Sequence, residues 1–179
     1  MDKLVIRLVL LIHLICMLDG KLIMFSNITC ESKDFSVAKV EYCYVHQVSH
    51  IKNYMSLRYS MFKPVMNGVI FHGKFMIYRN GWRSFLYSIK MDMCKFMELR
   101  YNALAKLIFG LTDGKTNINH TCPYNNEKYI AMDEIMSTDL SMRLGGIPLG
   151  KGQYGFFTRW IWQNATKVET NIFFNVVRD

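Results

Sequence analysis

Prolines, low-complexity tracts and long apolar runs are all scarce in this sequence. Only 3 of the 179 residues are prolines, and no biased tract favours disorder. Hydrophobic residues make up 51% of the chain and aromatic residues 14%, which favours a packed globule. No stretch supplies the roughly 20 apolar residues that span a bilayer. The composition therefore predicts an ordered globular protein.

Motifs that would indicate an enzyme or a metal site are also missing. The cysteines show no C-x-x-C spacing of the kind that holds zinc, and no segment resembles the G-x-S-x-G nucleophile elbow. Gly145–Gly152 matches the phosphate-binding loop up to its last position, where Gly152 replaces the Ser or Thr that ligates magnesium. We therefore expect no catalytic residues, no metal and no cofactor.

The pattern of the first 20 residues predicts a secretory signal peptide. A charged start at Met1-Asp2-Lys3 is followed by an apolar run from Leu4 to Leu18 and then by Asp19-Gly20. A membrane anchor is the competing interpretation, but the run is too short to span a bilayer. Cleavage leaves residues 21–179, or 179 − 20 = 159 residues, a length that suits one domain. We expect a secreted, extracellular protein.

The chain carries few acidic residues for its number of basic ones. Its 22 Lys and Arg residues exceed its 14 Asp and Glu residues, and the formal net charge is +8. Outside the cell this charge favours a membrane surface, acidic glycans or an acidic receptor face rather than nucleic acid. A solvated basic surface without a specific partner is the alternative.

Four cysteines remain after the predicted cleavage, an even number that favours disulfides in an oxidising compartment. Four cysteines allow three connectivities. We favour Cys30–Cys43 and Cys94–Cys122, because each pair encloses one local excursion of the chain. Three sequons then become candidate glycosylation sites. Their acceptor residues are Asn27, Asn119 and Asn164.

Alternating apolar and polar residues dominate the mature chain, which predicts half-buried strands. The predicted strands span residues 37–48, 55–62, 69–79, 84–91, 152–163 and 168–177. Asn80-Gly81 is a strong hairpin signal. Residues 95–109 instead have apolar positions at helical spacing, which predicts an amphipathic helix that ends at Gly110. A second short helical stretch is expected between Met132 and Met142.

These elements predict an all-β sandwich of antiparallel strands with one lateral helix. Its aromatic and methionine side chains either fill the core or line a cavity for an apolar ligand. Composition does not separate these alternatives. The candidate lining residues are Tyr59, Met61, Phe71, Phe75, Ile77, Phe85, Tyr87, Phe156, Trp160 and Phe174.

Several short strings carry a family resemblance. They are Asn27-Ile28-Thr29-Cys30-Glu31, Glu41-Tyr42-Cys43, Phe62-Lys63-Pro64, Phe85-Leu86-Tyr87, Cys94-Lys95-Phe96, Pro148-Leu149 with Gly152 and Tyr154, and the most specific one, Asn117-Ile118-Asn119-His120-Thr121-Cys122-Pro123-Tyr124. The mature chain resembles an insect family of small secreted proteins of unknown function. That family is commonly placed beside the ML (MD-two-related lipid-recognition) proteins and the ganglioside activator.

The resemblance implies an immunoglobulin-like β-sandwich or cup that holds lipid between its sheets, and for some members a link to taste or pheromone detection. The better-known ML proteins tie an early cysteine to the last strand. This chain has no cysteine after Cys122, so their disulfide pattern does not carry over to it. We therefore expect a non-enzymatic secreted protein that binds a lipid or other apolar small molecule and acts as a chemosensory accessory. The alternative is an extracellular protein-interaction module with a filled core.

Overall fold

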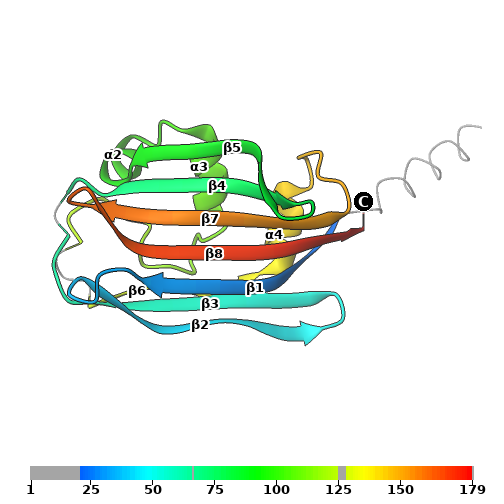
Figure 1. Cartoon of the computed structure of the whole chain (residues 1–179), viewed down its shortest axis with the longest axis horizontal. Helices are drawn as coiled ribbons and strands as arrows, with labels where there is room; N and C mark the ends of the chain where they lie inside the picture. Colours follow the sequence, from blue (N-terminus) through cyan, green and yellow to red (C-terminus); the bar gives the residue numbers. More distant parts are fainter. Residues whose placement is uncertain (1–20, 66, 125–127, 179) are drawn as a thin grey trace, which may run out of the picture.

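The chain folds into two antiparallel sheets with three short helices among the residues that the structure describes (Figure 1). The structure is a computed structural model, and it describes residues 21–65, 67–124 and 128–178. The strands are β1 (Leu22–Ser32), β2 (Ala38–Ser49), β3 (Lys52–Met61), β4 (Ile70–Tyr78), β5 (Trp82–Asp92), β6 (Tyr129–Met136), β7 (Gly152–Trp162) and β8 (Ala165–Arg178). The helices are α2 (Met93–Leu99), α3 (Ala103–Gly110) and α4 (Ser137–Leu144).

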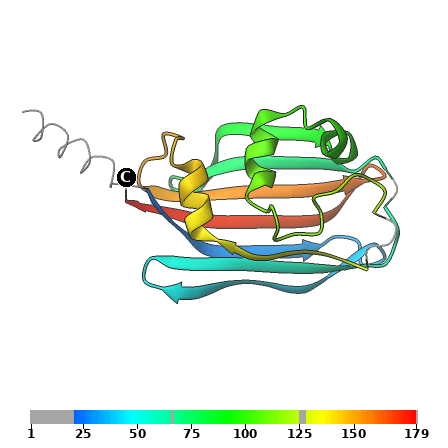
Figure 2. The ribbon, with the colours of Figure 1, turned by 180° about the vertical axis from the view of Figure 1, so that it is seen from behind.

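The larger sheet has five strands in the order β1-β8-β7-β4-β5, and the smaller has three in the order β2-β3-β6. Every strand pair is antiparallel. Helices α3 and α4 lie on one side of the five-stranded sheet, which Figure 2 shows from that side. The opposite face of this sheet, seen in Figure 1, carries no helix in the described part of the chain. The predicted all-β sandwich is confirmed.

The six predicted strands correspond to β2, β3, β4, β5, β7 and β8 within one to three residues at most ends. The alternation was reliable because these strands turn one face towards the core, which is buried in β4 and partly buried in β2. In β4, for example, Phe71, Phe75 and Ile77 are buried and Lys74 is exposed. The hairpin predicted at Asn80-Gly81 joins β4 to β5, with positive φ at both residues (51° and 122°). This backbone conformation is the one that favours an Asn-Gly pair in a tight hairpin.

The single helix predicted for residues 95–109 is wrong, because the segment forms two helices. Helix α2 ends at Arg100, which adopts a left-handed conformation (φ 49°) and donates its backbone N–H to the Phe96 carbonyl. Helix α3 begins after Asn102, whose side-chain oxygen accepts a hydrogen bond from the Ala105 N–H at 2.9 Å. The helical spacing continues through the break, so the hydrophobic pattern alone did not reveal it.

Two strands escaped the sequence-based prediction. β1 was not assigned, and the first residues of the stretch proposed as helical between Met132 and Met142 belong to β6. Helix α4 begins only at Ser137. Both strands break the two-residue period: β1 has a register shift between Phe25 and Asn27, and Glu134 in β6 has a φ of 53°. Such irregularities move apolar residues out of simple alternation.

The predicted signal peptide, residues 1–20, lies outside the described residues. Among the residues that are described, no helix is long and apolar enough to cross a membrane.

Candidate ligand-binding cavity

A cavity of about 190 Å³ lies between the two sheets and is partly closed by the helices. The three-stranded sheet lines it with Met55, Leu57, Tyr59, Met61, Ile130, Met132 and Ile135. The five-stranded sheet contributes Phe71, Phe75, Phe156, Thr158, Trp160, Val168, Thr170 and Phe174, among others. Ile108 and Phe109 from α3 and Leu140 and Leu144 from α4 complete much of the wall. The cavity therefore brings together residues from nearly every element of the fold.

Aromatic rings form the wall on the side of the five-stranded sheet. The ring centroid of Phe71 lies 4.9 Å from that of Trp160 and 5.5 Å from that of Phe109 in α3. Phe75 and Phe156, from neighbouring strands, have centroids 4.9 Å apart. Gly73 makes this packing feasible, because a Cβ at that position would lie 2.6 Å from Cζ of Phe156. Strands β4 and β7 thus supply rings to a wall that a larger residue at position 73 would disturb.

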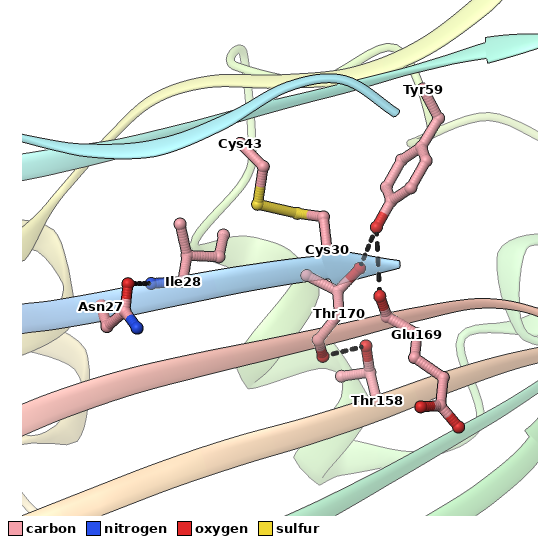
Figure 3. Close-up of a disulfide and its surroundings, with 8 residues drawn as sticks. All are labelled: Asn27, Ile28, Cys30, Cys43, Tyr59, Thr158, Glu169 and Thr170. Atoms are coloured by element: carbon pink, nitrogen blue, oxygen red, sulfur yellow. Dashed lines mark hydrogen bonds between the residues drawn. A yellow bond between two sulfur atoms is a disulfide. The ribbon is translucent and has the colours of Figure 1, made fainter. Parts of the chain in front are cut away.

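The polar groups on this side of the cavity are bound within the protein (Figure 3). The Tyr59 hydroxyl of β3 reaches across to β8, where it lies 2.8 Å from Thr170 Oγ1 and donates to the Glu169 carbonyl at 3.2 Å. Thr158 Oγ1 in turn donates to the Thr170 carbonyl at 2.8 Å. Burial raises the pKa of Tyr59 to about 12. This hydroxyl is therefore neutral over the physiological range, and it links the two sheets.

The other hydroxyl groups and the one ammonium group of the described wall also have protein partners. The Thr112 hydroxyl donates to the Phe109 carbonyl at 2.8 Å, and the Tyr124 hydroxyl donates to the Ile118 carbonyl at 2.6 Å. Lys167 pairs with Asp34, with Nζ and Oδ2 2.9 Å apart. The hydrogen bond from this lysine is the main reason why the pKa of Asp34 falls to about 2.

The wall consequently offers a ligand mainly methyl, thioether and ring surfaces. A polar ligand group placed deep in the cavity would lose its bonds to water and would compete with hydrogen bonds already made, a cost of about 1–3 kcal/mol per group. An apolar ligand carries no such cost. The arrangement is suited to binding by dispersion and desolvation rather than by polar recognition.

Seven of the ten predicted lining residues do line this cavity. They are Tyr59, Met61, Phe71, Phe75, Phe156, Trp160 and Phe174. Ile77 is buried in the core but does not contribute to the lining, and Phe85 packs beside Tyr154 with ring centroids 5.5 Å apart. Tyr87 is 62% exposed, so its assignment was wrong.

An irregularity in β5 explains the error at Tyr87. Lys74 pairs with Ser88, and Met76 pairs with Ser84, so three residues of β5 oppose the single residue of β4 between these pairs. Leu86 within this bulge has a φ of 57°. The two extra residues interrupt the pairing locally, so the side chain of Tyr87 reaches solvent, although Phe85 and Ile89 on either side of it keep the inward alternation.

Sequence reasoning also missed much of the opposite wall. Met55 and Leu57 share the inward side of β3 with Tyr59 and Met61, so the two-residue period already seen in this strand could have identified them. Ile118 and Tyr124 lie in the connection between α3 and β6. No periodic signal marks residues in such an irregular segment.

Two disulfides stabilise the surroundings of the cavity. Cys30 in β1 is bonded to Cys43 in β2, so this bridge crosses between the two sheets (Figure 3). Cys94 in α2 is bonded to Cys122, and this bridge encloses α3. This is the pairing that was favoured from the sequence. Two disulfides fit a protein that folds in an oxidising compartment.

The three sequons lie in different environments. Asn27 in β1 and Asn164 in the turn between β7 and β8 are exposed. Asn119 is half-buried, and its amide nitrogen donates to Asp113 Oδ1 at 2.7 Å. None of the three residues lines the cavity. Glycans at these positions would therefore leave the cavity wall unchanged.

Known families cover only part of the chain. Residues 71–156 match the family described as "Protein of unknown function (DUF1091)". The matched segment runs from β4 into β7 and includes the Cys94–Cys122 bridge, α3 and α4. This match supports an uncharacterised domain family, whose description names no activity. The chain matches no curated protein.

The same segment supplies a large share of the cavity wall, including Phe71, Phe75, Phe109 and Phe156. The Cys30–Cys43 bridge and the whole of β8 lie outside it. Within the described part of the chain, no group of three or more His, Cys, Asp or Glu residues is arranged to hold a metal ion.

Proposed function

We propose that this protein is a secreted, non-enzymatic carrier that binds a lipid or another apolar small molecule between its sheets. The observation that carries the proposal is the largely apolar cavity of about 190 Å³, whose hydroxyl and ammonium groups are bound within the protein. The predicted signal peptide, the sequons and the resemblance to the insect family placed beside the ML proteins support secretion and a lipid-like ligand. The same resemblance favours an accessory role in chemosensation.

The cavity volume limits the size of the ligand. Pockets for drug-sized ligands measure about 300–1,000 Å³, whereas a dry engineered cavity of about 150 Å³ binds benzene. A cavity of about 190 Å³ is suited to a short hydrocarbon or to one segment of a longer chain. A fused four-ring sterol would require the sheets to move apart. The alternative of an interaction module with a filled core receives less support, because the space between the sheets is not filled.

Native mass spectrometry of the secreted protein tests this proposal. After enzymatic deglycosylation, we expect a fraction of the protein to carry a co-purified apolar molecule, or the empty protein to bind added octane or octanoic acid in preference to cholesterol. Absence of both co-purified and added ligand would contradict the carrier function and favour the interaction module.

A pair of variants on β8 locates the binding site. Val168 lines the cavity, whereas Val177, on the same strand, is exposed. Val168→Phe should fill part of the cavity and weaken binding of octane at least tenfold, while Val177→Phe should leave it unchanged. Thermal unfolding verifies that both variants are folded. Equal binding by the two variants would place the ligand elsewhere.

A further inference from the structure

The outward face of the five-stranded sheet carries a cluster of aromatic rings, which we call the outer aromatic cluster. It consists of Tyr78, Trp82, Phe157 and Phe173. Trp82 lies at its centre, with its ring centroid 5.3 Å from those of Tyr78 and Phe157 and 5.2 Å from that of Phe173. These residues come from β4, β5, β7 and β8, so the cluster crosses most of the sheet.

The cluster is separate from the cavity. None of its four residues lines the cavity, and they alternate along their strands with the inward residues Ile77, Phe156 and Phe174. Gly155 lies beneath the rings, where a Cβ would be 2.7 Å from Cε1 of Phe157 and 3.2 Å from Cζ3 of Trp82. Tyr78 is 48% exposed, and the other three rings are half-buried. No helix of the described chain covers this face (Figure 1).

Positive charge adjoins the cluster on the same face. Lys74 is the cross-strand partner of Phe157, and His72 is the partner of both Lys90 and Arg159. Partners in an antiparallel pair point to the same side of the sheet. Partial burial lowers the pKa of His72, and the neighbouring cations Lys74, Arg159 and Lys90 lower it further. This further lowering is a consequence of the three cations lying around one position.

The acidic groups on this face already have partners, and Asp92 at the end of β5 accepts the Lys95 backbone N–H at 3.0 Å. Glu169 binds Arg159 at 3.0 Å and lies 3.6 Å from Lys33, which also binds Glu31. Within the described residues, neither Lys74 nor Lys90 forms an ion pair. The face therefore combines aromatic rings with two lysines that form no ion pair within the described residues.

We propose that this face docks on a lipid bilayer surface rich in anionic headgroups. Such a surface presents negative charge above an apolar layer, which complements both the lysines and the rings. Tyrosine and tryptophan are favoured at membrane–water interfaces because their rings combine an apolar body with a polar group. Lysine near an anionic membrane contributes favourably to binding. An acidic protein or glycan would satisfy the lysines but would leave the rings without an apolar layer to enter.

Binding to vesicles tests the proposal with two pairs of variants of the secreted protein. Lys74→Glu with Lys90→Glu should weaken binding to phosphatidylcholine–phosphatidylserine vesicles about tenfold or more. Lys39→Glu with Lys52→Glu changes the net charge equally on the exposed surface of the other sheet and should have a much smaller effect. Tyr78→Ser should also weaken binding, whereas Tyr44→Ser, at a similarly exposed tyrosine of β2, should not.

Binding of the unaltered protein should decrease at high salt and be weak on pure phosphatidylcholine. Equal losses for both lysine pairs would show that net charge alone is responsible and would overturn the proposal. Failure to bind anionic vesicles would overturn it as well.

Asn27 provides one more control, because it is the cross-strand partner of Phe173 and a candidate glycosylation site. The glycosylated protein must bind. If the Asn27→Gln variant bound and the glycosylated protein did not, a glycan at Asn27 would be covering this face. That result would also overturn the proposal. The residues substituted on this face do not line the cavity. The vesicle-binding result is therefore independent of whether a ligand binds between the sheets.

Discussion

Tyr59 makes one of the few polar connections between the two sheets through the cavity region. Its hydroxyl joins β3 to β8 through Thr170 and the Glu169 carbonyl, in surroundings that are otherwise apolar. Burying a hydroxyl is costly unless it is hydrogen-bonded, and this one has partners. The charged phenolate would be far less tolerable in the same place, which is why burial raises the pKa of Tyr59 to about 12.

This shift predicts a specific loss of stability at high pH. The ordinary pKa of a tyrosine is 10.0, so the unfolded chain releases the Tyr59 proton before the folded protein does. The stabilisation is complete below about pH 10 and is lost as the pH rises towards 12, by about 2–3 kcal/mol in total. Tyr59→Phe should be about 1 kcal/mol less stable than the unaltered protein at pH 8, because it lacks the hydrogen bonds. That difference should shrink or reverse by pH 12.

Chemical denaturation of the two proteins between pH 8 and pH 12 measures this difference. The pKa of Tyr42 is also raised to about 12, mainly by burial, so Tyr42→Phe should show a similar trend. The control is therefore Tyr87→Phe, at a tyrosine that is 62% exposed. A constant difference between Tyr59→Phe and the unaltered protein across this range would contradict the prediction.

Asn53 shows what sequence patterns do not reveal about single residues. It is 1% exposed, and its side-chain amide exchanges two hydrogen bonds with the backbone of Phe25, at 3.1 Å and 2.7 Å. Phe25 adjoins the register shift of β1, where the regular ladder is interrupted. The side chain of Asn53 thus replaces missing sheet partners. The alternation indicates only that Asn53 lies in a strand. Its role depends on its contact with Phe25, which lies 28 residues earlier in the chain.

At the scale of elements, regular strands were predictable and their interruptions were not. β4 and β7 keep one face buried along most of their length, so their period and their contribution to the cavity followed from the sequence. The bulge at Leu86 and the left-handed Arg100 lie at residues that do not mark such conformations by their type. A pattern of hydrophobicity carries no information about a positive φ at such residues.

The boundary between α2 and α3 gives a testable consequence. Asn102 caps α3 by accepting the Ala105 N–H, one of the backbone donors that a helix start leaves unpaired. Asn102→Ala should lower the free energy of unfolding by about 0.5–2 kcal/mol, whereas Asn102→Asp should retain most of the stability. Urea denaturation of both variants provides the measurement. Similar losses for the two substitutions would indicate that the cap contributes little.

At the scale of the whole molecule, the two disulfides constrain different parts of the cavity wall. The chain between Cys30 and Cys43 contributes Val37 and Ala38 to the lining. The longer chain between Cys94 and Cys122 contributes Ile108, Phe109, Leu111, Thr112 and Ile118. The sequence favoured this disulfide pairing, but it did not predict which part of the cavity wall each closed segment supplies. The lining arises from contacts between elements that are distant in the chain.

Removing each bridge should therefore have different local effects. Either pair of Cys→Ala substitutions should destabilise the protein by about 2–4 kcal/mol, because the unfolded chain gains freedom. Loss of Cys94–Cys122 should in addition speed amide hydrogen exchange in α3 and in residues 111–118, since that bridge closes the segment containing them. Loss of Cys30–Cys43 should leave this segment protected.

Hydrogen exchange measured by mass spectrometry, under conditions in which both variants remain folded, separates the two cases. Equal protection of α3 in both variants would show that packing of Phe109 against Phe71 and Phe96, rather than the bridge, holds this wall of the cavity in place.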